Sequence, residues 1–271
     1  MSHDIHVEFT DANQAGTPEA MYGFLDLADA IPEVRQYKRR LRSRLALQPS
    51  ETVLDVGCGV GHEACRLAAE YPGIQVIGLD RETMLAEAAR RAKQRGVDVQ
   101  WLPGDAEAIP LPDASVDACM TERVLMYLAE PARGLSEMAR VLKPGGRIVS
   151  FELDYAATML GGDPRIAGLV VDLLHDSIGN ARLGRQLPFL LRDAGLVDVT
   201  FQPVAFHPPW AVHEAVISTP VRLAIQRGHL PPEPATVWLE QQAIAHAAGL
   251  FTVVFIGCLV SGRLPDLPAA A

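Results

Sequence analysis

The middle of the chain alternates short apolar runs with segments of helical periodicity. Between Thr52 and Asp154 the apolar runs are TVLDVG, IQVIGLD, VQWLP, SVDACMT and RIVSFELD. Segments such as HEACRLAAEY and the stretch 83–95 separate them, and their apolar residues recur at helical spacing. Strands and helices that alternate in this way are typical of a parallel sheet covered by helices on both faces. The pattern therefore predicts an α/β fold whose first five strands lie between Thr52 and Asp154.

The pattern loosens on both sides of this region. Beyond Asp154 it predicts helices at about 163–180 and 184–194, followed by strands at 197–206 and 251–260. The segment 208–249 contains a Pro-rich loop between two helical patterns, and we interpret it as a cover inserted between the last two strands. The first fifty residues predict helices whose basic side faces solvent or an anion. The chain is thus divided into a helical lead-in (1–50) and one domain (51–271) with a cover insertion at about 208–249.

Composition narrows the class of protein. Hydrophobic residues make up 49% of the 271 residues and charged residues 21%, which are the proportions of a folded chain rather than a disordered one. The formal net charge of −9 disfavours a nucleic acid substrate, because phosphate-rich polymers would be repelled. The four cysteines stand far apart without a CxxC pair, so we expect reduced thiols.

Two segments bear on the location of the protein. The opening MSHDIHVEFT has no basic segment followed by an apolar run, which a secretory signal requires. The longest uncharged apolar stretch, Ala247–Val260, is shorter than the ~18 to 20 residues that span a bilayer. We therefore expect a cytoplasmic protein without a membrane span.

A glycine-rich turn follows the first predicted strand and is the strongest local motif. It reads Asp55-Val56-Gly57-Cys58-Gly59-Val60-Gly61 and leads directly into a helical segment. Glycines are needed where the backbone turns sharply and a ligand approaches it closely. A dinucleotide-binding turn would place its third glycine one position later, where this chain has His62. The motif therefore indicates a nucleotide-like ligand but disfavours a nicotinamide cofactor.

The alternating glycines resemble the first motif of class I S-adenosylmethionine-dependent methyltransferases. Further resemblances follow in the same order along the chain: Asp80 at the end of the second strand, GDAE at 104–107 and LKPGG at 142–146. More weakly, ERVL at 122–125 and ELDY at 152–155 are similar to a bacterial branch related to ubiquinone and menaquinone methyltransferases. The resemblance implies a Rossmann-like, doubly wound sheet of seven mostly parallel strands.

The resemblance also implies S-adenosylmethionine as the cofactor and a set of residues that bind it. Asp80 would accept hydrogen bonds from both ribose hydroxyls, and Asp105 would accept one from the adenine amine. The full set is Asp55, Gly57, Cys58, Gly59, Gly61, Asp80, Arg81, Asp105, Ala106 and Glu122. Since methyl transfer is an in-line displacement, positioning supplies much of the acceleration and a dedicated base is not required.

Several side chains near the predicted carboxyl ends of the strands are candidates for the acceptor side. Asp154 and His175 are the candidate catalytic groups, and Tyr22, Arg123 and Tyr155 are expected to line the substrate pocket. No metal site is expected, because the zinc-like pattern His62-Glu63-x-x-Arg66 lacks its second histidine.

The predicted function is methyl transfer to an O, N or C atom of a small, partly apolar molecule. Because one fold supports several functions, two alternatives remain open. The protein could bind the cofactor as a sensor or scaffold without transferring the methyl group, or it could catalyse another reaction such as a cyclisation. The oligomeric state is left open.

Overall fold

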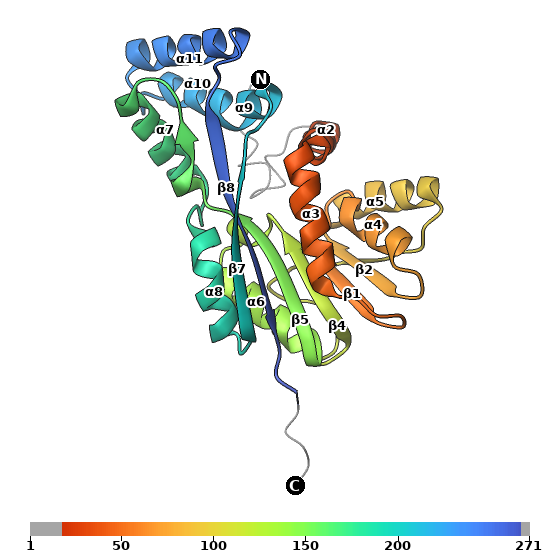
Figure 1. Ribbon diagram of the computed structural model, residues 1–271. Coiled ribbons are helices and arrows are strands. Elements are labelled where there is room, and N and C mark those ends of the chain that lie inside the picture. Colours follow the sequence, from red (N-terminus) through yellow and green to blue (C-terminus); the bar gives the residue numbers. More distant parts are fainter. Residues whose placement is uncertain (1–17, 267–271) are drawn as a thin grey trace.

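A computed structural model describes residues 18–266, which form one mixed sheet flanked by helices (Figure 1). Five strands run parallel in the order β3-β2-β1-β4-β5, and β8 lies antiparallel beside β5. Strand β7 completes the sheet on the far side of β8. The strands are β1 (Thr52–Val56), β2 (Gln75–Asp80), β3 (Gln100–Pro103), β4 (Val116–Glu122), β5 (Leu142–Leu153), β6 (Met159–Leu160), β7 (Val197–Phe206) and β8 (Val253–Arg263). The Rossmann-like α/β prediction is confirmed.

The strand count and one boundary differ slightly from the prediction. Seven strands make the sheet as expected, and the two-residue β6 adds a short pairing at the start of β8. The last strand was expected at 251–260 but continues to Arg263, because it pairs there with both Arg147 of β5 and Val197 of β7. Two neighbours therefore extend a strand whose own apolar pattern ends earlier.

Register aligns the carboxyl ends of the central strands. Val56, the last residue of β1, pairs with Leu79 of β2 on one side and with Thr121 of β4 on the other. The turn after β1 therefore emerges directly between Asp80 and Glu122, the residues that end the two neighbouring strands. In an open α/β sheet this edge is where ligands bind.

Helices cover both faces of the sheet, as the nearly continuous burial of β1, β2 and β4 requires. On one face α3 packs on β4, β5, β7 and β8, and its Tyr37 ring stacks on Phe151 of β5 with centroids 3.7 Å apart. On the other face α6 and α8 contact each other and β5 (Figure 1). These and the neighbouring helices are α3 (Pro32–Leu45), α4 (His62–Glu70), α5 (Glu82–Arg95), α6 (Pro131–Val141) and α8 (Leu183–Asp193).

A group of helices extends beyond the ends of β7 and β8 (Figure 1). It comprises α7 (Pro164–Ser177), α9 (Trp210–His213), the π-helical turn η3 (Glu214–Ser218), α10 (Thr219–Gln226) and α11 (Pro232–Ala247). Helices α7, α10 and α11 contact one another. We call α9 to α11 the cap helices. They lie within the segment 208–249, which was predicted to carry a cover.

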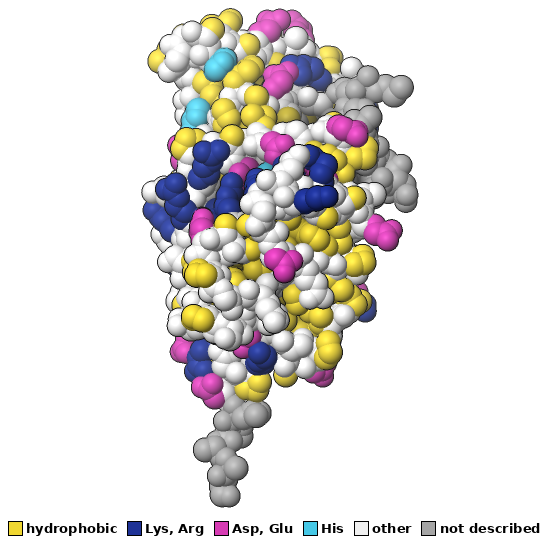
Figure 2. Space-filling model, turned by 90° about the vertical axis from the view of Figure 1, so that its right-hand side faces the viewer, with side chains coloured by type: hydrophobic (Ala, Val, Ile, Leu, Met, Phe, Trp, Pro, Cys, Tyr) yellow, Lys and Arg dark blue, Asp and Glu magenta, His cyan; other side chains and the backbone are white. Residues whose placement is uncertain are grey.

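The lead-in contributes α2 (Pro18–Ala30) and α3, while residues 1–17 lie outside the described part of the chain. The expectation that the basic side of this lead-in faces solvent holds for only part of α3. Arg35, Arg39 and Arg40 are exposed, whereas Lys38 and Arg42 are buried. Figure 2 shows Lys and Arg side chains gathered in a band across the middle of one face. None of the helices within residues 18–266 is long and apolar enough to cross a membrane.

Candidate functional site

The glycine turn is built by backbone conformations that favour glycine. Gly57, Gly59 and Gly61 have φ values of 69°, 55° and 78°, and Gly57 donates its N–H to the Leu79 carbonyl at 2.8 Å. A Cβ on Gly57 would lie 2.3 Å from a Val124 methyl group, so packing alone forbids a side chain there. Around Gly59 the nearest atom to an added Cβ is 3.4 Å away. The turn is therefore closed at Gly57 and open toward the cavity at Gly59.

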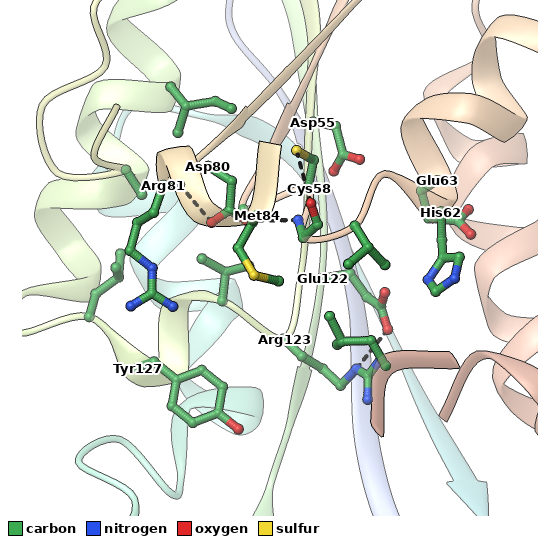
Figure 3. Close-up of a pocket in the computed structure, with 18 of the residues that line it drawn as sticks. Asp55, Cys58, His62, Glu63, Asp80, Arg81, Met84, Glu122, Arg123 and Tyr127 are labelled. Carbon is green, nitrogen blue, oxygen red and sulfur yellow. Dashed lines mark hydrogen bonds and ion pairs between the residues drawn. The ribbon is translucent and has the colours of Figure 1, made fainter. Parts of the chain in front are cut away.

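A cavity of about 400 Å³ lies over this turn at the carboxyl ends of the strands (Figure 3). That volume is within the usual range of small-molecule sites. The predicted residues that line it are Asp55, Gly57, Cys58, Gly59, Asp80, Arg81, Asp105, Ala106, Glu122, Arg123 and Tyr155. Gly61 is not among the residues that line the cavity: it is the N-cap residue just before α4, and a Cβ there would meet the Trp101 ring at 2.7 Å. The structure thus brings most of the predicted binding residues together in one space.

Asp80 stands at the end of β2, facing the glycine turn. Its carboxylate accepts hydrogen bonds from the N–H groups of Gly59 and Arg81, both at 2.7 Å. Burial raises the pKa of Asp80, while the two N–H groups act against this rise. Each carboxylate oxygen has a second lone pair, so Asp80 can still accept from hydroxyl groups of a ligand.

Asp55 carries an unsatisfied atom at the floor of the cavity. Its side chain is buried, and Oδ2 has no hydrogen-bond partner among the described residues. Burial and the nearby carboxylates of Glu63 and Glu122 raise the pKa of Asp55 well above its ordinary value. A buried acceptor without a partner is costly unless a ligand supplies one. A cationic ligand group would satisfy it, and the amino group of S-adenosylmethionine is such a group.

Lys38 reaches the cavity from α3 and was not predicted as a site residue. Its ammonium group lies 3.0 Å from Glu122 Oε2 and 2.9 Å from Asp29 Oδ1. Although burial raises the pKa of Glu122, the positive charges of Arg123 and Lys38 lower it to about 2. Lys38 also lies 3.7 Å from Glu63, another cavity residue that was not among the predicted binding residues. This network ties the lead-in helix to the end of β4.

The segment after β4 forms one wall of the cavity. Arg123 has a φ of 56°, a left-handed conformation that costs a residue with a side chain about 1 to 3 kcal/mol. Fully buried beneath it, Glu152 of β5 accepts from the N–H groups of Val124 and Leu125 at 3.0 and 2.9 Å and from that of Met126 at 3.4 Å. Burial raises the pKa of Glu152 to about 7. One carboxylate thus anchors the wall.

The structure does not bring the two candidate catalytic groups to the cavity. The Asp154 side chain is 2% exposed, is held by both Nε and Nη2 of Arg185, and is not among the residues that line the cavity. His175 lies on α7, partly exposed, with the exposed carboxylate of Asp176 3.3 Å from its Nδ1. A carboxylate paired with an arginine and a histidine that does not line the cavity are poorly placed to take a proton from a bound acceptor. These positions speak against the predicted roles.

Tyr22 was expected to line the substrate pocket, but the structure places it beside the cavity. Tyr22 of α2 donates its hydroxyl to the Thr83 carbonyl at 2.8 Å and packs beside the cavity without lining it. His62 does line it and lies 2.8 Å from Asp26 of α2. No residue of the cap helices is among those that line the cavity. Instead, the cap buries its own aromatic cluster around His213, which packs against Trp210 and Phe251.

The sheet order, the glycine turn and the acidic residue that ends β2 define a nucleoside-binding α/β enzyme of the class I methyltransferase type. Residues 54–150 match the family model described as "Methyltransferase domain". The chain is 33% identical over 248 residues to an uncharacterized 37.1 kDa protein in transposon Tn4556 of Streptomyces fradiae, covering 89% of this chain and 71% of that protein. A demethylmenaquinone methyltransferase of Thermus thermophilus is 40% identical over 116 residues, 42% of this chain and 53% of its own length.

Solved structures share the fold. The [4+2]-cyclase SpnF is 25% identical with a TM-score of 0.56, and the match covers 86% of this chain and 82% of that one. A methyltransferase-like structure from Bacillus halodurans is 22% identical with a TM-score of 0.61, covering 84% of this chain and 99% of that one. The chain belongs to the class I S-adenosylmethionine-dependent methyltransferases, and S-adenosylmethionine is its cofactor. It matches only about half to two thirds of the length of the demethylmenaquinone methyltransferases.

Proposed function

We propose that the protein transfers the methyl group of S-adenosylmethionine to an O, N or C atom of a small, partly apolar molecule. The observation that carries this is the composition of one continuous cavity. The glycine turn and Asp80 line it together with the apolar and aromatic side chains of Val124, Tyr127, Leu128 and Tyr155. A cofactor and an apolar acceptor would meet within this one space. When bound, the cofactor supplies a methyl group on a cationic sulfur.

In this proposal the chain's own residues bind and orient the reactants. Asp80 would hold the ribose hydroxyls, Asp105 and Ala106 the adenine, and Asp55 the cationic amino group. Burial raises the pKa of Tyr155 above its ordinary value, so its hydroxyl stays protonated and can donate to an acceptor. Catalysis would rest mainly on alignment in a site shielded from water.

We also propose the broader organisation of the molecule. Residues 1–50 would act as a helical lead-in that closes over the cofactor, since Phe24 and Leu25 of α2 and Lys38 of α3 line the cavity. Residues 51–271 would form the methyltransferase domain with its cover at about 208–249. A cytoplasmic location is consistent with four buried free cysteines.

Mass spectrometry of the purified protein tests whether it binds the cofactor. Radiolabelled methyl transfer into fractionated metabolite extracts tests whether it methylates a small molecule. We expect S-adenosylmethionine or its demethylated product to copurify, and label to enter a small molecule. An Asp80→Ala variant serves as the matched control, in which both signals should fall. Copurified cofactor without transfer of label would support the sensor alternative. A new ring formed in a compound that gains no label would support the cyclase alternative, which the likeness to SpnF favours.

A further inference from the structure

Arg123 is a charged side chain that the backbone presents to the cavity in a strained conformation. Its φ of 56° lies in the left-handed region, which a residue with a branched or long side chain rarely adopts. Strain of this kind persists only where the surrounding structure enforces it, and it gathers at functional sites. The strain therefore points to a role for the side chain.

Several hydrogen bonds enforce that conformation. The N–H of Arg123 donates to the Phe151 carbonyl at 2.8 Å, so the turn is tied to β5. The next three N–H groups donate to the buried Glu152 carboxylate. The backbone on both sides of the Arg123 side chain is thus fixed before any ligand binds, which lowers the entropic cost of binding.

The guanidinium group of Arg123 has unused donors. Its Nε lies 2.7 Å from Glu122 Oε1, and no partner in the described part of the chain engages Nη1 or Nη2. Glu122 Oε1 also accepts the Tyr37 hydroxyl, and its Oε2 lies 3.0 Å from the Lys38 ammonium, which Asp29 and Glu63 pair as well. Glu122 therefore engages the Arg123 guanidinium through Nε alone, and the outer edge of the guanidinium is left for a ligand. Figure 3 shows Arg123 and Glu122 side by side within the cavity.

The position of Arg123 assigns this charge to the acceptor side. The sheet order places β2, with Asp80, on one side of the glycine turn and β4 and β5 on the other. Arg123 follows β4 and shares its wall with Tyr127 and Tyr155. The outer edge of the planar guanidinium, formed by Nη1 and Nη2, can donate to both oxygens of a carboxylate or of another acidic group.

We propose that Arg123 binds an acidic oxygen of the methyl acceptor, so that the substrate class is an organic anion with an apolar body. The inference rests on the proposed function, and it adds the charge of the acceptor to it. The unengaged Nη1 and Nη2 of Arg123, the fixed backbone and the aromatic wall together describe a subsite for such a molecule. Arg123 orients the acceptor by its anionic group, while the apolar body lies against the tyrosines.

A matched pair of probes tests this directly by calorimetry. The protein is saturated with S-adenosylhomocysteine and titrated with 3-phenylpropanoate and with 3-phenylpropanamide, which share a shape but differ in charge. We expect the acid to bind at least tenfold more tightly than the amide. In Arg123→Gln this preference should fall to within threefold, while affinity for S-adenosylhomocysteine stays within twofold. Arg123→Lys, which keeps the charge but loses the fork of donors, should retain part of the preference.

Arg90→Gln is the control, because Arg90 is an exposed arginine of α5 that pairs with Glu87 and is not among the residues that line the cavity. At saturating S-adenosylhomocysteine it should leave the preference for the acid unchanged. A wild-type protein that binds the acid no more tightly than the amide, including binding neither, overturns the inference. So does a tenfold loss of S-adenosylhomocysteine affinity in Arg123→Gln, since Arg123 would then hold the cofactor's own carboxylate. Acid preference without transfer of label in the extract assay would instead count against the proposed function.

Discussion

The carboxylate of Asp80 accepts a hydrogen bond from the backbone N–H of Gly59 at 2.7 Å. This bond joins the end of β2 to the middle of the glycine turn, two segments that are 21 residues apart in the chain. The acidic residue therefore has two functions at once: it fixes the turn, and it presents lone pairs to the cavity. Changes at Asp80 affect the shape of the site as well as its contacts.

Replacing Asp80 should weaken cofactor binding. Loss of charge-assisted hydrogen bonds in Asp80→Ala should cost about 1.5 to 3 kcal/mol of binding free energy, a tenfold loss of affinity or more. Asp80→Asn keeps one acceptor oxygen and should lose less. Calorimetry with S-adenosylhomocysteine measures both. Unchanged affinity in a folded Asp80→Ala protein would remove Asp80 from the site.

A second prediction separates backbone strain from steric exclusion. Gly59 and Gly96 both have left-handed backbones, with φ values of 55° and 66°, but only Gly59 lines the cavity. Alanine at either position should lower the free energy of unfolding by about 1 kcal/mol. Gly59→Val should also abolish cofactor binding and methyl transfer, whereas Gly96→Ala should leave binding intact. Denaturant titrations paired with calorimetry report the two effects, and a Gly59→Val protein with parental turnover would contradict the assigned turn.

The part of the cavity that the glycine turn forms could be predicted because these residues are a contiguous backbone motif. The spacing of Gly57 and Gly59 in the sequence is itself the spacing of the turn. Lys38 could not be predicted in the same way, because it is one of several basic residues on α3, and only tertiary burial distinguishes it from exposed Arg39 and Arg40.

The acceptor half shows why single residues near a strand end were harder to assign. Glu152 and Asp154 stand two residues apart at the end of β5, and we expected Asp154 to be the functional carboxylate. Arg185, 31 residues further along the chain, neutralises Asp154, while Glu152 anchors the wall of the cavity. The choice between them depends on a long-range partner that no local pattern reveals.

Glu152 should give the fold a measurable pH dependence. Its pKa is raised by burial from 4.5 to about 7, so the folded state retains a proton that the unfolded state releases between these values. The free energy of unfolding should therefore fall by roughly 3 kcal/mol as pH rises from about 4.5 to 7, at 1.36 kcal/mol per pKa unit. In Glu152→Gln this component should be absent. Denaturant titrations across that range compare the two proteins.

Glu137 provides the control of opposite sign. Its hydrogen bond to Arg140 lowers its pKa, so its contribution to stability is present at neutral pH and is lost as pH falls. In Glu137→Gln, the free energy of unfolding should therefore still fall between pH 4.5 and 7, because Glu152 is unchanged in that variant. If Glu152→Gln and wild type show parallel curves, Glu152 does not titrate in this range.

The cap should be sensitive to acid through His213. This ring is fully buried among Trp210, Phe251 and Trp238, and neither nitrogen has a partner among the described residues. Burial lowers its pKa to about 4, and Arg222, His246 and His207 add to the effect. The unfolded state therefore binds a proton between these pH values that the folded state does not bind. The free energy of unfolding should fall by roughly 3 kcal/mol as pH drops from 6.5 toward 4. Limited proteolysis of the cap at pH 7 and pH 4.5 measures this, and His213→Phe should remove the difference.

Trp238 tests whether the cap acts separately from the cofactor site. Its side chain is 1% exposed, and its Nε1 donates to the Gly161 carbonyl at 3.1 Å, so it holds α11 to the segment after β6. Trp238→Ala should cost about 3 to 5 kcal/mol by leaving a cavity, whereas Val237→Ala, at a side chain 46% exposed, should cost far less. Thermal unfolding measures both variants. Because no residue of the cap helices lines the cavity, affinity for S-adenosylhomocysteine should stay within twofold in the folded Trp238→Ala protein. Loss of cofactor affinity in that folded protein would instead place the cap in the nucleotide site.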